Sequence, residues 1–260
     1  MRKIIVKLGG STLEDKSIIN QLAQDVSAIP SGTGLAVVHG GGREIKSELS
    51  LKGIESEFVQ GQRVTDKETM RCVVKTLSGS VNKEIVSIFR SEGVNACGIS
   101  GVDGGLIKTE KLLVANQDIG FVGKISEIDT TIIEALFSKN FLPVIAPVSS
   151  NEKGDLFNVN ADNAAGAIAE AVNADDLIFI SDIPGVLIKE CVRSVIKASE
   201  AESLISEGHI RGGMIPKLRS SVNAVNKGVK RVHICDWKGQ GSLIERLKKT
   251  PESGSIICRG

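Results

Sequence analysis

Short apolar runs alternate along the chain with stretches whose apolar residues recur every three to four positions. The apolar runs are rich in β-branched residues, and they predict strands at 3–8, 35–38, 94–99, 142–147, 176–181 and 230–235. Helical patterns separate most of these strands, which is the order of elements in βαβ units. The pattern therefore predicts an α/β fold around one mainly parallel sheet.

Two amphipathic helices stand out between the strands. Residues 15–28 and residues 66–92 each carry one apolar stripe. For the longer helix, the capping-box pattern at 65–68 predicts the start, with Thr65 as the cap, and Gly93 predicts the end. The Ser-Gly-Ser at 78–80 predicts a kink midway along it.

Two segments depart from this rhythm. Residues 106–128 hold short strand-like pieces that predict a hairpin lying on top of the sheet, and the polar residues 151–155 predict a turn before a second short pair of strands. No low-complexity linker separates the two halves of the chain. We therefore expect two lobes that share one continuous sheet, an N-terminal lobe of residues 1–173 and a C-terminal lobe of residues 174–260.

The composition of the chain limits the classes of molecule that it is expected to bind. The 260 residues carry 32 basic and 31 acidic side chains, a net charge of +1, which predicts binding neither to nucleic acid nor to a membrane surface. The five cysteines are scattered without a zinc-site spacing and are expected to be reduced thiols. No apolar run is long enough for a membrane span. We expect a cytoplasmic protein with small-molecule partners.

Glycine clusters follow two of the predicted strands. Lys7 and Leu8 run into Gly9-Gly10, and His39 runs into Gly40-Gly41-Gly42 before a helix. Open α/β sheets bind ligands at the carboxyl ends of their strands, and glycine lets backbone N–H groups approach an anion closely. A tight turn would explain either cluster alone. The two clusters together with Lys7 favour an oxyanion-binding site, in which His39 is expected to be structural and to brace the glycine loop.

Polar residues follow later strands as well. Asn158, Asn160 and Asp162 lie at a strand-to-helix junction, where Asp162 could serve only as the helix N-cap or could also be functional. A further loop, 181–187, also follows an apolar strand. Lys217 lies close to a predicted helix start, where a cation opposes the helix dipole unless an anion lies beside it.

Ten stretches, in this order, are similar to motifs of one known family: VKLGGS (6–11), VVHGGG (37–42), GQRVTDKETM (61–70), VNKEIV (81–86), GISGVDGGLI (98–107), IGFVGKI (119–125), LPVIAPV (142–148), FNVNADNAAGAIA (157–169), ISDIPGVL (180–187) and GGMIPKL (212–218). The chain thus resembles the amino acid kinase family over nearly its whole length. This resemblance implies a three-layer αβα sandwich, with an acyl amino acid on the N-terminal lobe and a nucleotide on the C-terminal lobe.

The resemblance also implies a reaction. In the members with the most similar motifs, the side-chain carboxylate of N-acetyl-L-glutamate attacks the γ-phosphoryl group of ATP and yields an acyl phosphate for arginine biosynthesis. An ionised carboxylate needs no general base, so positioning and charge neutralisation carry the catalysis. Mg²⁺ is expected on the ATP phosphates and not in a protein cage of carboxylates.

Residue roles follow by similarity. Lys7 and Lys217 would flank the transferring group and Asp162 would hold both lysines. The acyl amino acid would be bound by Gly41, Gly42, Arg63, Asn158 and Asn160, with Arg63 as a planar fork to its α-carboxylate. The nucleotide would be bound by Gly9, Gly10, Ser181, Asp182, Gly185, Val186, Leu187, Ile210 and Met214.

Alternatives remain at this stage. A related kinase phosphorylates aminoadipate or glutamate held on a carrier protein, and it would need basic surface near the acid pocket and changes around Arg63. Carbamate, aspartate and uridylate kinases share the fold, but the contexts at 157–162 and 212–217 fit them less well. A non-catalytic sensor of nucleotide or amino acid is a different class, and it would not need Lys7, Asp162 and Lys217 together.

The resemblance extends to assembly. Family members inhibited by arginine carry an extra N-terminal helix that links dimers into hexamers, whereas this sequence begins at its first strand. We therefore expect an arginine-insensitive homodimer in which the helix at 66–92 makes the contact.

Overall fold

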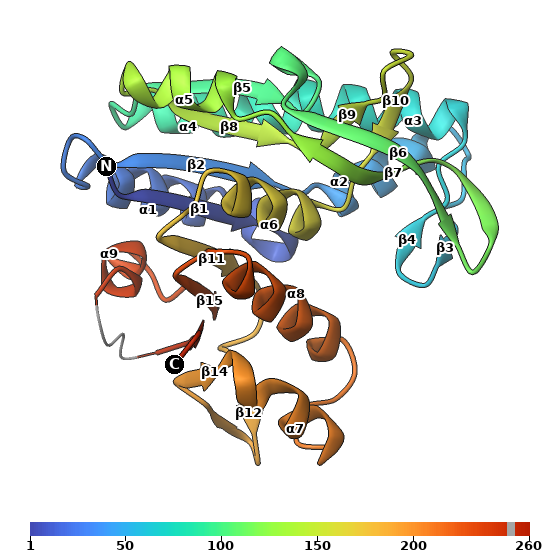
Figure 1. The fold of residues 1–260 in the computed structure, drawn as a ribbon. Coiled ribbons are helices and arrows are strands. Elements are labelled where there is room, and N and C mark those ends of the chain that lie inside the picture. Colours follow the sequence, from blue (N-terminus) through green and yellow to red (C-terminus); the bar gives the residue numbers. More distant parts are fainter. Residues whose placement is uncertain (249–252) are drawn as a thin grey trace.

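The structure is a computed structural model that describes residues 1–248 and 253–260 (Figure 1). Its strands are β1 Lys3–Leu8, β2 Gly34–His39, β3 Phe58–Val59, β4 Gln62–Arg63, β5 Ala96–Ser100, β6 Ile107–Val114, β7 Gln117–Ile128, β8 Leu142–Ala146, β9 Val148–Ser150, β10 Leu156–Asn158, β11 Asp176–Ile180, β12 Leu187–Ile188, β13 Cys191–Val192, β14 Val195–Lys197, β15 Arg231–Cys235 and β16 Ser255–Cys258. Its α-helices are α1 Lys16–Ser27, α2 Gly42–Leu51, α3 Lys67–Val73, α4 Asn82–Ser91, α5 Thr131–Ser138, α6 Ala161–Ala171, α7 Ala201–Ser206, α8 Met214–Asn226 and α9 Ser242–Arg246.

The main sheet has eight strands in the order β14-β16-β15-β11-β1-β2-β8-β5. All neighbours pair in parallel except β15 and β16, which are antiparallel. The mainly parallel sheet expected from the alternating pattern is confirmed, and all six predicted strands are found. Because the strands are covered on both faces, they are apolar along nearly their whole length.

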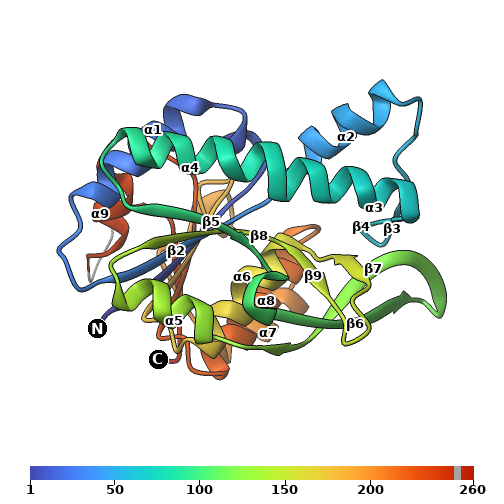
Figure 2. The ribbon, with the colours of Figure 1, turned by 90° about the horizontal axis from the view of Figure 1, so that it is seen from above.

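Helices cover both faces of this sheet (Figures 1 and 2). Ile4, Val6 and Leu8 of β1 pack against residues of α1 and α4, whereas Ile5 belongs to the other core, with residues of α5, α6 and α8. This division follows from the alternation of side chains along a strand. The three-layer αβα sandwich is confirmed.

The predicted long helix runs without a break from α3 to α4 (Figure 2), but its middle, Val74–Val81, is a π-helix. The expectation of a kink at 78–80 thus gives way to a change of helix type. The predicted capping box is wrong, because Asp66 is the N-cap and its side chain accepts a hydrogen bond from Thr69 N. The helix ends at Ser91 with Glu92 as its C-cap, and Gly93, the next residue, has φ of +79°, as expected for a glycine that ends a helix.

The expected hairpin is present and longer than its sequence signal. Strands β6 and β7 pair antiparallel, and β9 and β10 pair across the turn at 151–155. Together they close into a small barrel in the order β10-β7-β6-β9. This barrel continues past the end of β8, so it extends the N-terminal half of the molecule beyond the carboxyl edge of the main sheet (Figure 1).

The two predicted lobes share the main sheet, since β11 pairs with β1 directly. The division at residue 174 therefore stays a prediction. Within residues 1–248 and 253–260, no helix is both long and apolar enough to cross a membrane.

An ionic cluster closes the amino ends of β1, β11 and β15. Asp176, fully buried, accepts hydrogen bonds from Arg2 Nε at 3.1 Å and Nη2 at 2.7 Å, from Arg231 Nε at 2.8 Å and from His233 Nε2 at 2.9 Å. Burial alone would raise the pKa of Asp176, but the hydrogen bond from His233 and the two arginines outweigh it and lower that pKa. The carboxylate is therefore fully compensated.

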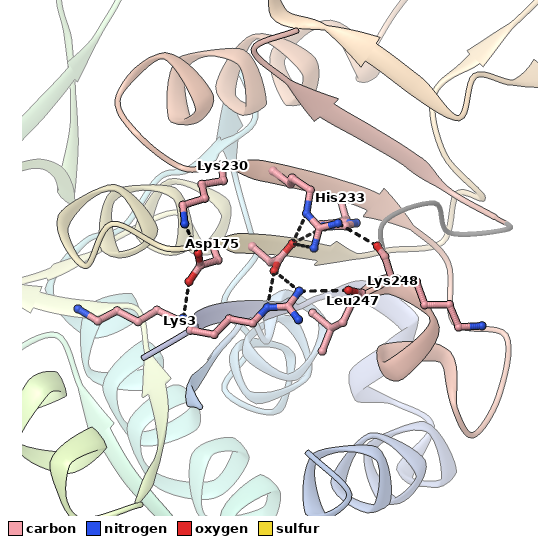
Figure 3. Close-up of polar contacts among 9 residues, drawn as sticks. Lys3, Asp175, Lys230, His233, Leu247 and Lys248 are labelled. Carbon is pink, nitrogen blue, oxygen red and sulfur yellow. Dashed lines mark hydrogen bonds and ion pairs between the residues drawn. The ribbon is translucent and has the colours of Figure 1, made fainter. Parts of the chain in front are cut away.

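Neighbouring groups extend the same cluster, as Figure 3 shows. The Asp175 carboxylate accepts from Lys3 N at 2.8 Å and pairs with Lys230 Nζ at 2.6 Å. The arginines on Asp176 also donate to the carbonyls of Leu247 and Lys248, at 3.2 and 2.8 Å. This end of the sheet is thus tied to the segment after α9.

Candidate functional site

Two lysines and a carboxylate meet at the opposite, carboxyl edge of the sheet. Lys7 Nζ of β1 lies 2.7 Å from Asp162 Oδ1 in the first turn of α6, and Lys217 Nζ in the first turn of α8 lies 4.0 Å from Asp162 Oδ2. The side chains are 13%, 31% and 18% exposed in the order Lys7, Asp162, Lys217. One carboxylate between two ammonium groups leaves net positive charge, which suits an anionic ligand.

The position of Lys7 follows from strand alternation. Lys7 shares a face with Ile5, the face that α6 and α8 cover, so the last inward side chain of β1 on that face is a lysine at the sheet edge. Lys7 pairs in register with Phe179 of β11, whose ring lies 5.6 Å from Lys217 Nζ. The aromatic face therefore supports the second ammonium group through a cation–π contact.

The electrostatics of Lys217 reflect its surroundings. Burial lowers the pKa of the ammonium group, Asp162 acts in the opposite direction, and Lys7 lowers the pKa further. A phosphate placed between the two lysines would oppose these effects and raise the pKa of Lys217, since an opposite charge favours the charged form of the ammonium group. The pair is thus better suited to a bound anion than to solvent.

Gly9 makes room for the first of these lysines. A Cβ atom at this position would lie 2.1 Å from Lys7 Nζ, so any side chain would displace the ammonium group. The next residue, Gly10, lies against the carboxylate of Asp182 from the end of β11, which would be 3.0 Å from a Cβ there. The first glycine pair thus packs directly against charged groups of the site.

The second glycine cluster joins β2 to α2. Gly41 has φ of +151°, a conformation that L side chains rarely adopt, and a Cβ there would lie 2.5 Å from Leu77 Cδ2 of the π-helical segment. The N–H groups of Gly41 and Gly42 stand at the start of α2, before any intrahelical carbonyl is available to them. They are donors for an external acceptor.

Arg63 lies beside this loop and is 8% exposed. Its Nη2 donates to the Gly42 carbonyl at 2.9 Å, its Nη1 donates to Ser56 Oγ, and its guanidinium lies 4.8 Å from the Phe58 ring centroid. Burial lowers the pKa of the guanidinium, which nevertheless stays charged. Two of its five N–H donors are engaged in these two bonds, so the fork is fixed in direction without being used up.

The two asparagines of the fourth loop have different surroundings. Asn158 is the last residue of β10, the strand that precedes α6, and its Nδ2 lies 3.4 Å from Thr65 Oγ1. Asn160 is the N-cap of α6, and its side chain accepts from the N–H groups of Asp162 and Asn163 at 2.9 and 3.1 Å. The reading of Asp162 as the cap is therefore wrong, which leaves its carboxylate available for the two lysines.

The residues expected around the nucleotide divide into two groups. Ser181 and Asp182 follow β11 at the same edge as the lysines, and Leu187 is 44% exposed. Val186 and Ile210 are buried at 0% and 2% and belong to the core under α8. The structure thus brings Ser181 and Asp182 to the site edge, whereas the side chains of Val186 and Ile210 contact the core.

Two further expected residues belong to the same region. Gly185 packs on the last strand, where a Cβ would lie 2.7 Å from Ser255 Oγ, and the Val186 N–H donates to that same oxygen at 2.8 Å. Met214 begins α8, three residues before Lys217, and packs against the core. The contacts of Gly185 and Val186 with Ser255 thus hold the loop that follows β11 against the last strand.

Sequence reasoning missed Phe179 and Asn82. Nothing marks Phe179 in an apolar strand as a cation–π partner. Asn82 is 1% exposed and occupies the first position of α4, between the apolar Val81 and Ile85. A polar residue beside the buried stripe of a helix is a signal that could have been used.

No group of three or more histidine, cysteine, aspartate or glutamate side chains within residues 1–248 and 253–260 is arranged to hold a metal ion. The cationic and N–H-rich edge instead fits an anionic polyphosphate, which can carry its own metal.

Comparisons with known proteins identify the family. The model of the amino acid kinase family matches residues 2–236. Acetylglutamate kinase of Caldanaerobacter subterraneus subsp. tengcongensis is 44% identical over 98% of this chain and 87% of its own length. Acetylglutamate kinase of Aquifex aeolicus is 43% identical over 92% of this chain and 86% of its own length.

Solved structures give the same picture. A protein from Streptococcus mutans UA159 superposes with a TM-score of 0.80 at 28% identity, covering 99% of each chain. The resemblance noted in the ten sequence motifs is therefore confirmed along nearly the whole length. This chain belongs to the amino acid kinase family.

Proposed function

We propose that this protein phosphorylates the side-chain carboxylate of N-acetyl-L-glutamate with ATP, forming an acyl phosphate for arginine biosynthesis. The observation that carries the proposal is the Lys7–Asp162–Lys217 arrangement, in which one carboxylate holds two ammonium groups at the carboxyl edge of the sheet. The acetylglutamate kinases at 43% and 44% identity support the choice of acceptor.

The reaction needs no proton transfer. A carboxylate oxygen of the acceptor attacks the γ-phosphorus while the bond from that phosphorus to the β,γ-bridging oxygen breaks, and ADP leaves with the electron pair. Lys7 would neutralise charge on the side of the nucleophile and Lys217 on the side of the leaving group. Each such electrostatic contact is typically worth about 10²–10³ in rate. Asp162 would keep both ammonium groups charged and in place.

The acceptor would lie beside the second glycine loop. Gly41 and Gly42 would both contact it, with the Gly42 N–H donating to the acceptor and the Gly41 N–H donating to the phosphoryl group being transferred. Arg63 would bind its α-carboxylate with the donors that Gly42 and Ser56 do not occupy. Asn158 would hydrogen-bond the acetylamino group. Asn160 already caps α6, so its remaining contact would come from its amide nitrogen.

The nucleotide would lie over the C-terminal part of the sheet edge. Gly9 and Gly10 would contact its phosphates, and the loop from Ser181 to Leu187 would contact its ribose and base, with Ile210 and Met214 forming the apolar floor. The glycines and lysines fit a polyphosphate, and Mg²⁺ held on that polyphosphate would neutralise part of its charge.

Acyl-phosphate trapping tests the proposal. Enzyme with MgATP and hydroxylamine is offered N-acetyl-L-glutamate, glutamate or aminoadipate in parallel, and hydroxamate is measured for the wild type and for Lys217→Ala. We expect product with N-acetyl-L-glutamate alone and a loss of 10²-fold or more in the variant. Product with no free acid would overturn the proposal and favour a carrier-bound acceptor, or a sensor if nucleotide still binds.

Assembly and location belong to the same proposal. We infer a cytoplasmic homodimer in which α3, the π-helical segment and α4 form the contact, and an activity insensitive to arginine. Sedimentation tests the assembly, and an assay with added arginine tests the insensitivity. A monomer, a hexamer or inhibition by arginine would contradict this part of the proposal.

A further inference from the structure

His39 is the last residue of β2, directly before the second glycine loop at 40–42, and it is fully buried. Its Nδ1 lies 2.8 Å from the Gly40 carbonyl oxygen, and its Nε2 lies 3.2 Å from Asn82 Nδ2. The same Asn82 nitrogen also lies 2.9 Å from the Val144 carbonyl and 3.3 Å from the Ile99 carbonyl. One ring nitrogen thus meets the loop, and the other meets a side chain anchored to two strands.

These partners determine which nitrogen of the His39 ring carries a hydrogen. Since Asn82 Nδ2 faces two carbonyl oxygens, this atom is the amide nitrogen, and its partner Nε2 is an acceptor. The Gly40 carbonyl can only accept, so Nδ1 carries the proton and donates to it. Burial lowers the pKa of His39 to about 4, which agrees with a neutral imidazole of a single tautomer.

The bond to Gly40 fixes one peptide plane. In a trans peptide the carbonyl of Gly40 and the N–H of Gly41 point in opposite directions, and the described residues contain no cis peptide bond. His39 contacts α4, on the face of the sheet opposite α6 and Asp162. Holding the carbonyl toward His39 therefore turns the Gly41 N–H toward the face that carries Lys7.

Packing also holds the glycine loop and the Asn82 side chain in place. Leu77 of the π-helical segment occupies the space where a Gly41 side chain would be, and Gly98 of β5 leaves room for Asn82, whose Oδ1 would be 2.1 Å from a Cβ there. Lys83 Nζ donates to that Oδ1 at 3.0 Å. The amide is thus fixed at both of its ends.

We propose that His39, oriented by Asn82, is a positioning residue that aims the Gly41 N–H at the transferring phosphoryl group. This inference rests on the proposed function and deepens it. The side chains themselves do not touch the reacting atoms, so their effect should fall on kcat and only weakly on the KM values. A residue that served packing alone would show no such division.

Two replacements of His39 separate the ring nitrogens. In His39→Asn the side-chain nitrogen stands near the place of Nδ1 and can still donate to Gly40, whereas in His39→Gln the amide group stands near the place of Nε2 and leaves Gly40 unbound. We expect kcat to fall 10- to 100-fold in His39→Gln, with both KM values within threefold, and kcat within threefold of wild type in His39→Asn. Equal losses of kcat in the two variants would overturn the proposal.

A measurement on the unchanged protein covers the case in which neither variant folds. The ¹⁵N shifts of the His39 imidazole at pH 7 should show a neutral ring with the proton on Nδ1. A proton on Nε2 would overturn the proposal, and this result does not depend on which acid the enzyme phosphorylates. In Asn82→Ala the single tautomer should be lost and kcat should fall as in His39→Gln. An unchanged tautomer and kcat would remove Asn82 from the proposal.

Discussion

The same three-strand core, β1, β11 and β15, carries a charged cluster at each end, and the two clusters differ in how completely they are paired. At the amino end, Asp176 is fully buried and receives four hydrogen bonds of 2.7 to 3.1 Å. At the carboxyl end, Lys217 lies 4.0 Å from Asp162, beyond hydrogen-bond distance, and all three side chains reach solvent.

The difference is what we expect between a structural cluster and the functional cluster proposed at the carboxyl end. A closed set of ionic bonds holds chain segments together and offers nothing to a ligand, whereas a loosely paired ammonium group such as that of Lys217 retains donors for an incoming anion. Formal charge alone does not distinguish the two ends, because each combines a central aspartate with two permanently charged side chains. Geometry and exposure do.

Lys217→Met should have the largest effect. We expect kcat to fall by 10²–10³, about 3–4 kcal/mol of transition-state stabilisation, because a charge on the transferring group is no longer neutralised. Thermal stability should stay level or rise, since a partly buried charge is removed. Lys227→Met, at the C-cap of the same helix and 57% exposed, is the matched control and should leave kcat unchanged. A large loss of stability without loss of kcat would erase the distinction.

Asp176→Asn should act in the opposite way. We expect the free energy of unfolding to fall by about 3 kcal/mol, at the low end for breaking a buried pair, because the two arginines are partly exposed. The kcat of the folded enzyme should remain within twofold. Denaturant titration measures the first quantity and steady-state kinetics the second, and a tenfold drop in kcat at unchanged stability would contradict the structural role.

Gly9→Ala tests how tightly the carboxyl end is built. The new methyl group would occupy the place of the Lys7 ammonium, so the lysine must move, and we expect kcat to fall 10- to 100-fold. Gly79→Ala, which meets nothing within 4 Å, controls for glycine replacement as such. Wild-type kcat in Gly9→Ala would show that the position of Lys7 tolerates displacement.

The smallest effect concerns acid stability. The pKa of His39 is lowered to about 4 in the folded protein, below the usual 6.5, so the unfolded chain binds an extra proton between these values and stability falls as the pH falls through that window. Burial also lowers the pKa of His233, which lies in the cluster at the amino end of the sheet. Wild-type protein should lose free energy of unfolding between pH 6 and pH 5. In His39→Asn this loss should be smaller by about 1 kcal/mol, and the part that His233 contributes should remain. Identical pH slopes in variant and wild type would contradict this assignment.

Much of the fold follows from local pattern. The six strands are short β-branched apolar runs, and the two long helical segments repeat their apolar residues with a period near 3.6, and packing overrode neither signal. The helix starts were less predictable, because Thr65 and Asp66, or Asn160 and Asp162, are all good caps by residue type. Only the backbone path decides which of two neighbouring caps is used.

The site was predictable as a set of positions and not as a geometry. Strand ends place Lys7 and the glycines at one edge, and the family motifs add Asp162 and Lys217. The unequal distances from Asp162 to the two lysines depend on how α6 and α8 pack on the sheet, which no short motif encodes. The support from Phe179 and from the His39–Asn82 pair also arises from residues far apart in sequence.

The π-helical segment Val74–Val81 gives the chain a tolerance for length at this place. A π-turn holds about one residue more than an α-turn, so the wider turns take up an extra residue while α3 and α4 keep their relative orientation. Removing one residue within the segment would convert it toward an α-helix and leave both Met70 and Asn82 near their present neighbours, whereas removing one residue within α4 would rotate all that follows by about 100°. A single deletion should thus be tolerated better within Val74–Val81 than within α4.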